Sequence, residues 1–366
     1  WLYIGCTKNI SYIFRICPDP DINFFLYTPD HETMPMQVSV GSKWTNLTET
    51  DFKPHNPTKI IIHGYNSDMD LPALVEIRKE YLKTTKYNIF TVDWAPLAKS
   101  PCYLGAVHNA RHVGSCTAQL IRQIRNAGAK EIHLIGFSLG AHIPNYIAIS
   151  LRPYILPRIT GLDPALPLFV TLNIDEKLDK SDAKFVDVYH TNAFAQGKAE
   201  NSGHVDFFLN GGVVQPGCWA ENRFFSCNHH RAPLYFAESI NTKKGFWGWP
   251  CTSFILYLLG RCPPTETQIL MGENVSWKSS GMYLVLTESV SPFAVGKYVG
   301  PLVEILKKIS EKDRKELLNK YQKKIIEFIE DDELTQESSK HIQIEYLLLS
   351  EFADNIFSRI SNKSLT

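Results

Sequence analysis

The stretch EIHLIGFSLGAHIP, residues 131–144, ends an apolar run with a serine between two glycines. Ser138 stands in the pattern G-x-S-x-G, which forms a sharp turn between a strand and a helix and lifts the serine hydroxyl above the sheet. Both parts of that context are present, because EIHLI has the pattern of a strand and AHIPNYIAIS that of a helix. Gly136 and Gly140 would be needed where strand and helix pack closely. The stretch therefore predicts a nucleophilic serine rather than an ordinary loop serine.

Strand and helix patterns alternate on both sides of this turn. The strand patterns are KIIIHGY (59–65), NIFTVDW (88–94), RITGLDP (158–164) and KFVDVYHT (184–191), and the helical ones are residues 71–85 and 113–128. Such alternation predicts βαβ units and a largely parallel sheet covered on both faces. In these sheets the active site lies beyond the carboxyl ends of the strands. From 185 to about 295 the pattern becomes more β-like and rich in loops.

The composition changes after residue 296. Two amphipathic segments follow, with apolar residues at helical spacing among many charges. We therefore expect a catalytic domain over residues 1–296 and a helical extension over 297–366. The helices of the extension would dock on the catalytic domain, associate with a second copy or a partner, or lie on a lipid surface.

Charge and cysteine content narrow the class of protein. The 366 residues carry a formal net charge of +0, unlike the basic surface of a nucleic-acid binder, and no apolar run approaches the ~20 residues of a spanning helix. Eight cysteines fall into four couples that are local in sequence, and four N-x-S/T sequons begin at Asn9, Asn46, Asn274 and Asn362. With a chain that starts at Trp1, these features predict a secreted, processed protein with disulfides. The alternative is a cytosolic enzyme with free thiols.

A serine nucleophile needs an acid and a base, which follow the serine in this order along the chain. Asp163 ends a strand pattern and precedes a proline, although an aspartate there also serves as a turn cap. For the base, order alone leaves four histidines open: His190, His204, His229 and His230.

Several motifs together resemble the pancreatic lipase family over about residues 55–295: IIIHGY, VDWAPLA, NARHVG, LIGFSLGAH, GLDPALP, SDAKFVDVYHT, GHVDFFLNGG, QPGC and CNHHR. The resemblance implies an α/β-hydrolase fold, a Ser138–His229–Asp163 triad and an oxyanion hole from the backbone N–H groups of Tyr65 and Leu139. It implies hydrolysis of lipid esters without a catalytic cofactor.

One departure is IPNY (143–146), where the family has small residues. If that bulk displaced the serine, the chain would be a yolk-like or storage protein that binds lipid without hydrolysing it.

The resemblance also bears on the substrate. Cys218 and Cys227 correspond to the ends of the family's lid but enclose only eight residues, and the loop AFAQGKAENS (193–202) is short as well. This combination resembles phospholipase A1 members, including insect and venom enzymes, while a triacylglycerol or broad lipase is the alternative. Trp219, Phe224 and Phe225 would touch the lipid surface, or else pack down as an apolar plug.

KLDKSDAKFVDV resembles the family's structural calcium loop, with Asp179 and Asp182 as ligands and Ile174 and Lys177 contributing carbonyls. The alternative is a solvated acidic loop. The resemblance further implies the bridges Cys218–Cys227 and Cys251–Cys262. The remaining cysteines, Cys6, Cys17, Cys102 and Cys116, are expected to tie the N-terminal segment to the region after VDW, and their three connectivities stay open.

Overall fold

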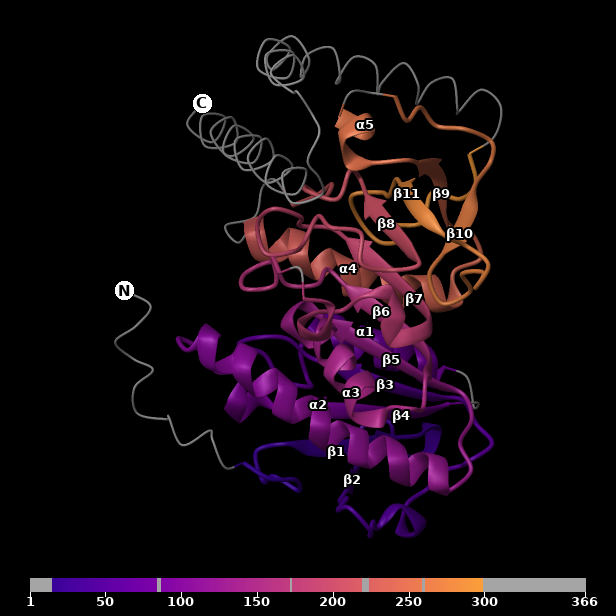
Figure 1. The fold of residues 1–366 in the computed structure, drawn as a ribbon. Helices are drawn as coiled ribbons and strands as arrows, with labels where there is room; N and C mark the ends of the chain where they lie inside the picture. The colour runs from indigo at the N-terminus through magenta and orange to yellow at the C-terminus, as the bar shows by residue number, and fades with distance from the viewer. Residues whose placement is uncertain (1–14, 84–86, 172, 219–223, 259–260, 299–366) are drawn as a thin grey trace.

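The computed structural model describes residues 15–83, 87–171, 173–218, 224–258 and 261–298. One sheet of eleven strands runs through these residues in the order β10-β9-β11-β8-β7-β6-β5-β3-β4-β1-β2 (Figure 1). The strands are β1 Asn23–Tyr27, β2 Met36–Val38, β3 Thr58–Ile62, β4 Asn88–Asp93, β5 Ile132–Phe137, β6 Leu156–Leu162, β7 Ala183–His190, β8 Val205–Leu209, β9 Phe246–Cys251, β10 Ile269–Met271 and β11 Gly281–Val285. The helices are α1 Pro72–Leu82, α2 Tyr103–Asn126, α3 Ile143–Leu151, α4 Phe224–Asn241 and α5 Phe254–Leu258.

The middle of the sheet is parallel and its two margins are antiparallel. Strands β4, β3, β5, β6, β7, β8 and β11 pair in parallel, whereas β1 and β2 on one side and β9 and β10 on the other pair antiparallel. This arrangement is the α/β-hydrolase architecture that the alternating patterns and the family resemblance predicted. It aligns the carboxyl ends of the parallel strands, where β5 leads into Ser138 and β6 leads into Asp163.

Helices cover both faces of the sheet, so the central strands are buried on both sides. Along β3, Ile60 and Ile62 pack into the core on the face covered by α2 and α3, while Ile61 packs on the face covered by α1 and α4. Alternate side chains of a strand point to opposite faces, and a doubly covered strand is therefore largely apolar on both. All five residues of β3 are buried, which is why its three consecutive isoleucines show no alternation with exposed polar residues.

Two helices differ from the sequence prediction. Helix α2 begins at Tyr103, ten residues before the expected start at Val113. The segment 103–112 lacks a clear apolar stripe, because Asn109 is buried and Leu104 is exposed. The helix ends at Asn126, and Gly128 follows with a φ of +109°. Helix α4 lies within the region expected to be β-like. Pro233 and a run of polar residues hid its pattern, and the helix packs against α1.

Within the described residues, no helix combines the length and the apolar character required to cross a bilayer. The expected helical extension, residues 297–366, lies almost entirely outside the described part of the chain, which ends at Tyr298.

Candidate active site

Ser138 occupies the turn between β5 and a short 3-10 turn, Ser138–Ala141, that leads into α3. Its φ is +57°, a left-handed conformation that costs a non-glycine residue free energy and marks a functional turn. A Cβ atom on Gly136 would lie 2.3 Å from the Gly140 carbonyl oxygen, and one on Gly140 would lie 2.2 Å from the His63 oxygen. Both glycines are thus required for the close packing that the motif predicted.

The IPNY departure is accommodated without disturbing this turn. Pro144 lies in the first turn of α3, where its missing N–H is tolerated. Tyr146 is buried against Gly114 of α2, where an added Cβ would come within 2.5 Å of the Tyr146 Cβ. The Tyr146 hydroxyl donates to the Glu176 carbonyl at 2.9 Å. Gly114 therefore provides the space that the bulkier side chain needs, and Ser138 keeps the elbow conformation.

Asp163 follows β6 and is fully buried, with a φ of +43°. Its Oδ1 accepts hydrogen bonds from the backbone N–H groups of Thr191 and Asn192, at 2.8 and 3.0 Å, just after β7 ends. These bonds fix the orientation of the carboxyl group. The remaining oxygen, Oδ2, is left to contact an imidazole.

His229 lies on α4 and its Nδ1 is 2.5 Å from Asp163 Oδ2. The imidazole is 5% exposed and its ring centroid is 4.6 Å from that of Phe137, the residue before Ser138. With Nδ1 donating to the carboxylate, the neutral ring presents Nε2 as its proton acceptor. The structure thus brings His229 and Asp163 together, 66 residues apart in sequence, beside the serine turn.

The other three histidines have different surroundings. His190 is fully buried between Asp206 Oδ1, at 2.9 Å, and the Lys198 carbonyl, at 2.7 Å. His204 Nδ1 accepts from the Val186 N–H. Burial, and secondarily the neighbouring His229, lowers the pKa of His230 to about 4. His229 is the candidate base that meets Asp163.

The two expected oxyanion donors belong to segments that meet at Ser138. Leu139 is buried within the 3-10 turn that starts at the serine. Tyr65 follows Gly64, at which an added Cβ would lie 2.8 Å from the Ser138 Cβ and 3.3 Å from its Oγ. The loop carrying Gly64 is fixed by Trp94, whose Nε1 donates to the His63 oxygen at 2.9 Å. Backbone from both segments therefore lies close to the serine hydroxyl.

Three supporting residues were not predicted from the sequence. Thr191 and Asn192 hold Asp163 through backbone groups, which carry no side-chain signal. Gly197 packs directly on the acid, since an added Cβ would lie 2.5 Å from Asp163 Oδ1 and 2.7 Å from Oδ2. An isolated bridge pairs Gly197 with Ala165. The loop 193–202 thus folds back over the strand end that carries the acid.

The segment expected to form a short lid is only partly described. The bridge Cys218–Cys227 is present, with nine residues of separation. Trp219 lies outside the described residues. Phe224 and Phe225 begin α4, so part of the bracketed segment is helical and continues into the helix that carries His229.

Asp179 and Asp182, the expected calcium ligands, lie at the short turn before β7. Asp179 caps this turn, with its Oδ1 accepting from the Ser181 N–H at 2.7 Å, while Asp182 Oδ2 accepts from the Asp179 N–H at 2.9 Å. Asp182 is 5% exposed. Burial, with a smaller contribution from the neighbouring carboxylates, raises the pKa of Asp182 to about 8. A buried carboxyl group beside other acids is more typical of a cation site than of a solvated acidic loop.

The remaining bridges agree with the sequence expectation and narrow the connectivity that it left open. Cys251–Cys262 forms as the resemblance implied. Cys17 pairs with Cys116 across 99 residues, which excludes the pairs Cys6–Cys17 and Cys102–Cys116 from the three connectivities left open. Cys102 is also disulfide-bonded. The expected connection between the N-terminal segment and the region after VDW is confirmed, because Cys116 lies on α2.

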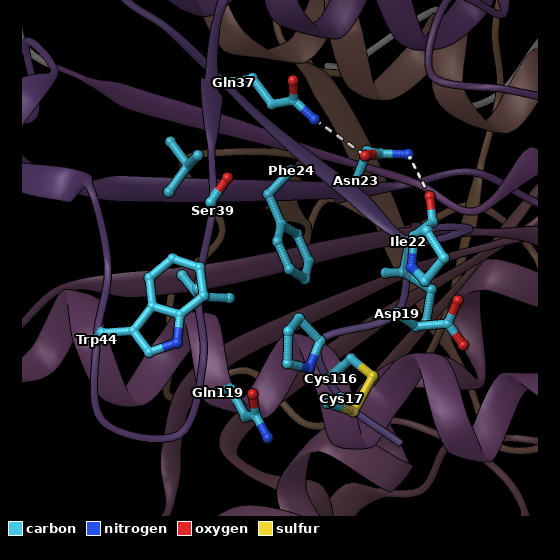
Figure 2. Close-up of a pocket in the computed structure, with 14 residues that line it drawn as sticks. Cys17, Asp19, Ile22, Asn23, Phe24, Gln37, Ser39, Trp44, Cys116 and Gln119 are labelled. Atoms are coloured by element: carbon cyan, nitrogen blue, oxygen red, sulfur yellow. Dashed lines mark hydrogen bonds between the residues drawn. A yellow bond between two sulfur atoms is a disulfide. The ribbon is translucent and has the colours of Figure 1, made fainter. Parts of the chain in front are cut away.

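A cavity of about 330 Å³ lies away from these residues (Figure 2). Its walls come from residues 17–24, β2 with the loop to Trp44, and α2 at Cys116 and Gln119. None of the candidate catalytic residues lines it. The cavity is therefore distinct from the candidate active site.

Comparison with known proteins places this site in a family. The family model described as Lipase matches residues 7–293. The chain is 33% identical over 291 residues to mouse pancreatic lipase-related protein 2, covering 73% of this chain and 60% of that protein. It is 33% identical to human pancreatic triacylglycerol lipase, covering 71% and 60%, and 34% identical to Lipase member H-A of Xenopus laevis, covering 66% and 53%.

The chain thus spans between 53% and 60% of the length of these relatives. The matched region contains the serine turn, the strand end at Asp163 and the helix that carries His229. On the family model and these similarities, the chain belongs to the Lipase family, within the pancreatic lipase group that its motifs indicated.

Proposed function

We propose that the protein is a secreted serine hydrolase that cleaves carboxylic esters of lipids, with Ser138 as nucleophile, His229 as general base and Asp163 as the orienting acid. The observation that carries the proposal is the hydrogen bond between His229 Nδ1 and the buried Asp163 carboxylate, beside the left-handed turn at Ser138. Extracellular location is supported by the disulfides.

The reaction follows from these roles. His229 Nε2 accepts the Ser138 proton as the hydroxyl oxygen attacks the ester carbonyl, and Asp163 stabilises the resulting imidazolium. The backbone N–H groups of Tyr65 and Leu139 donate to the oxyanion; removal of one such donor typically raises the barrier by about 2.7–4 kcal/mol. The imidazolium then protonates the leaving alcohol. Water, deprotonated by His229, hydrolyses the acyl-enzyme and restores the serine.

We propose a phospholipid as substrate, with release of the sn-1 fatty acid. The short disulfide loop Cys218–Cys227 and the short loop 193–202 support this proposal, since a less covered cleft admits a polar headgroup. One of the relatives is named a triacylglycerol lipase, so a neutral glyceride is the alternative substrate.

We further propose a structural calcium ion held by Asp179 and Asp182, together with nearby backbone carbonyls. The support for this proposal is the buried carboxyl group of Asp182. Burial disfavours its ionised form, whereas a bound hard cation would favour that form. The ion would neutralise these carboxylates and brace the turn before β7. It takes no part in the ester chemistry.

The test is a product analysis on mixed phosphatidylcholine and triolein. The proposal expects fatty acid from the sn-1 position with a lysophospholipid, and no product from Ser138→Ala, which should fold normally. Ser280→Ala, an exposed serine elsewhere, is the matched control and should behave as the wild type. Fatty acid from triolein alone would establish the glyceride alternative. Near-normal activity of Ser138→Ala would refute the proposed mechanism.

A further inference from the structure

Two of the four N-x-S/T sequons lie within the described residues, at Asn46 and Asn274, whereas Asn9 and Asn362 lie outside them. Such a sequon accepts an N-linked glycan when the chain passes through a secretory route. The extracellular location that the disulfides support implies that route. The two asparagines differ in the use that the folded chain makes of the side-chain amide.

Asn46 uses both ends of its amide group inside the fold. Its Oδ1 accepts from the Ser39 N–H at 2.8 Å, and its Nδ2 donates to the Gln37 carbonyl oxygen at 3.2 Å. Two such bonds side by side use the amide hydrogen on the same side as Oδ1. A sugar attached to Nδ2 takes the place of that hydrogen, as the following Cα does in a trans peptide. A glycan on Asn46 would therefore break the bond to Gln37.

Asn274 is exposed in a turn whose other residues are held from inside. The Val275 N–H donates to the Gly272 carbonyl oxygen at 3.1 Å, and Val275 is 4% exposed. Glu273 pairs with the buried Lys59. The Asn274 side chain itself makes no hydrogen bond with any residue that the structure describes. The turn thus presents a free amide to solvent at a fixed place, and a glycan there would cost no native contact.

The turn lies at the edge of the sheet opposite to the candidate active site. It follows β10, the last strand of the sheet on one side (Figure 1). Glu273 contacts Lys59 and Arg158 near the amino ends of β3 and β6. Ser138 and Asp163, in contrast, follow the carboxyl ends of β5 and β6. A glycan on this turn would therefore leave the candidate active site uncovered.

An exposed indole stands three residues after Asn274. Trp277 is 52% exposed, and one face of its ring stacks on Phe185, with centroids 5.7 Å apart and an interplanar angle of 7°. The stacking fixes the indole and leaves its second face for another group. The C–H face of a sugar is apolar and packs well on an aromatic ring. Trp277 thus offers a platform beside the sequon.

We propose that Asn274 carries an N-linked glycan and that its first N-acetylglucosamine packs on Trp277. The donor is an oligosaccharide on a polyprenyl diphosphate. The Asn274 Nδ2 forms a bond to C1 of the sugar and gives up one proton to the transferase. The bond from C1 to the diphosphate breaks, and its electron pair leaves with the polyprenyl diphosphate. The proposal depends on the extracellular location and not on the ester chemistry.

The first experiment uses the full chain, secreted from cultured eukaryotic cells behind a cleavable leader. Peptide N-glycosidase in water labelled with heavy oxygen converts each glycosylated asparagine to a labelled aspartate, which peptide mass spectrometry locates. The label is expected at Asn274. It should be absent in Ser276→Ala and retained in Ser276→Thr, because the third sequon residue must carry a hydroxyl.

The matched control is Thr48→Ala, which removes the hydroxyl of the other sequon at an equally exposed position and should leave the label at Asn274 unchanged. A label at Asn46 in place of Asn274, or at neither asparagine, would overturn the proposal.

The second experiment tests the contact with Trp277 on protein that an endoglycosidase has trimmed to its first sugar. This form should melt about 1–3 °C above Asn274→Gln, because it gains one aromatic contact. In a Trp277→Ala background the two forms should melt together. Trp44→Ala removes an indole that is 55% exposed elsewhere and should retain the difference. An equal difference in the Trp277→Ala background would overturn the contact.

Hydrolysis of phosphatidylcholine separates this inference from the proposed function. Ser276→Ala, which lacks the glycan, should hydrolyse the lipid at the wild-type rate, because the turn lies away from Ser138. A wild type that carries the glycan and hydrolyses no lipid would refute the proposed function and leave the glycan site intact.

Discussion

Asp163 is held by close packing as well as by hydrogen bonds. Gly197 faces its carboxyl group with no room for a methyl group. Gly197→Ala should therefore push Asp163 away from His229 and lower the rate of ester hydrolysis about ten- to hundredfold, as small misplacements of catalytic groups do. Steady-state kinetics on phosphatidylcholine would measure this. Gln196→Ala, at the exposed neighbour, should retain the wild-type rate, and an equally active Gly197→Ala would show that the acid is not fixed by this contact.

His230 adds a pH dependence to stability. Its pKa is lowered to about 4 in the folded protein and is near 6.5 in the unfolded chain, so only the unfolded chain binds the proton readily between these values. Its stabilising contribution is present above pH 6.5 and is lost as the pH falls through 4, at a cost of up to about 3 kcal/mol. His230→Gln should flatten the fall of the unfolding free energy between pH 7 and 4, measured by urea denaturation.

The control is His108→Gln, at an exposed position on α2, which should leave the pH profile unchanged. If His230→Gln and the wild type lost stability in parallel over this range, burial of the neutral ring would not be the cause.

Sequence carries most information about the site where a motif defines the local backbone. The prediction of Ser138 as nucleophile rests on two glycines that contacts within a few residues and with the neighbouring strand β3 require. The prediction of Asp163 rests on chain order and on its place at a strand end. Gly197 was missed because its requirement comes from a residue 34 positions away, and Thr191 and Asn192 because they act through backbone N–H groups.

At the scale of elements, α4 joins the disulfide loop to the base. Cys227 is two residues before His229, so the Cys218–Cys227 bridge restrains the start of the helix that carries the imidazole. The double variant Cys218→Ser, Cys227→Ser should lose about 2–3 kcal/mol of stability, from the entropy of a loop of this length. It should also lose activity at temperatures where it remains folded, because the histidine is less well positioned.

The matched control is Cys251→Ser with Cys262→Ser, which opens a loop of similar length, eleven residues apart. It should show a similar fall in the unfolding free energy with the rate on phosphatidylcholine retained. Equal rates for the two double variants at a temperature where both are folded would contradict a positioning role for the first bridge.

The strands β3 to β7 of the parallel sheet were predictable from the sequence, whereas β8, β11 and α4 were not. Strands such as β3 and β5 are buried along their whole length and rich in isoleucine and leucine, as expected of a sheet covered on both faces. Helix α4 packs on α1 and on the sheet, and contacts with elements so distant in sequence leave no local pattern.

At the scale of the whole molecule, a buried ionic network connects the central strands of the sheet to the segment after β10, the strand at one edge. Lys59 of β3 pairs with Glu273, just after β10, and Arg158 of β6 pairs with Asp187 of β7 at 2.9 and 3.0 Å. Arg158 also donates to the Glu273 carbonyl at 2.7 Å. The carboxylate of Glu273 therefore balances the positive charges of Lys59 and Arg158, which are buried away from water.

Glu273→Gln should destabilise the protein by about 3–5 kcal/mol, because it leaves the Lys59 ammonium buried without its counter-charge. Glu76→Gln breaks the exposed Glu76–Lys79 pair and should cost at most about 1 kcal/mol. The double variant Lys59→Met, Glu273→Leu should recover most of the loss. Urea denaturation would measure all three, and a Glu273→Gln effect no larger than that of Glu76→Gln would contradict the account.

The network was not predictable from the sequence, since its members are scattered from residue 59 to 273 and become neighbours only when the strands align. The family and the fold were predictable from the sequence, because the motifs lie at strand ends that a parallel sheet brings to one edge.

The central claim is that Ser138 is activated by His229 and Asp163. The most direct measurement is the rate and position of labelling by a fluorophosphonate, read by peptide mass spectrometry. The account predicts a single adduct on Ser138, formed rapidly in the wild type and much more slowly in His229→Ala, with none in Ser138→Ala. An adduct on another residue, or a wild-type rate no faster than that of His229→Ala, would contradict it.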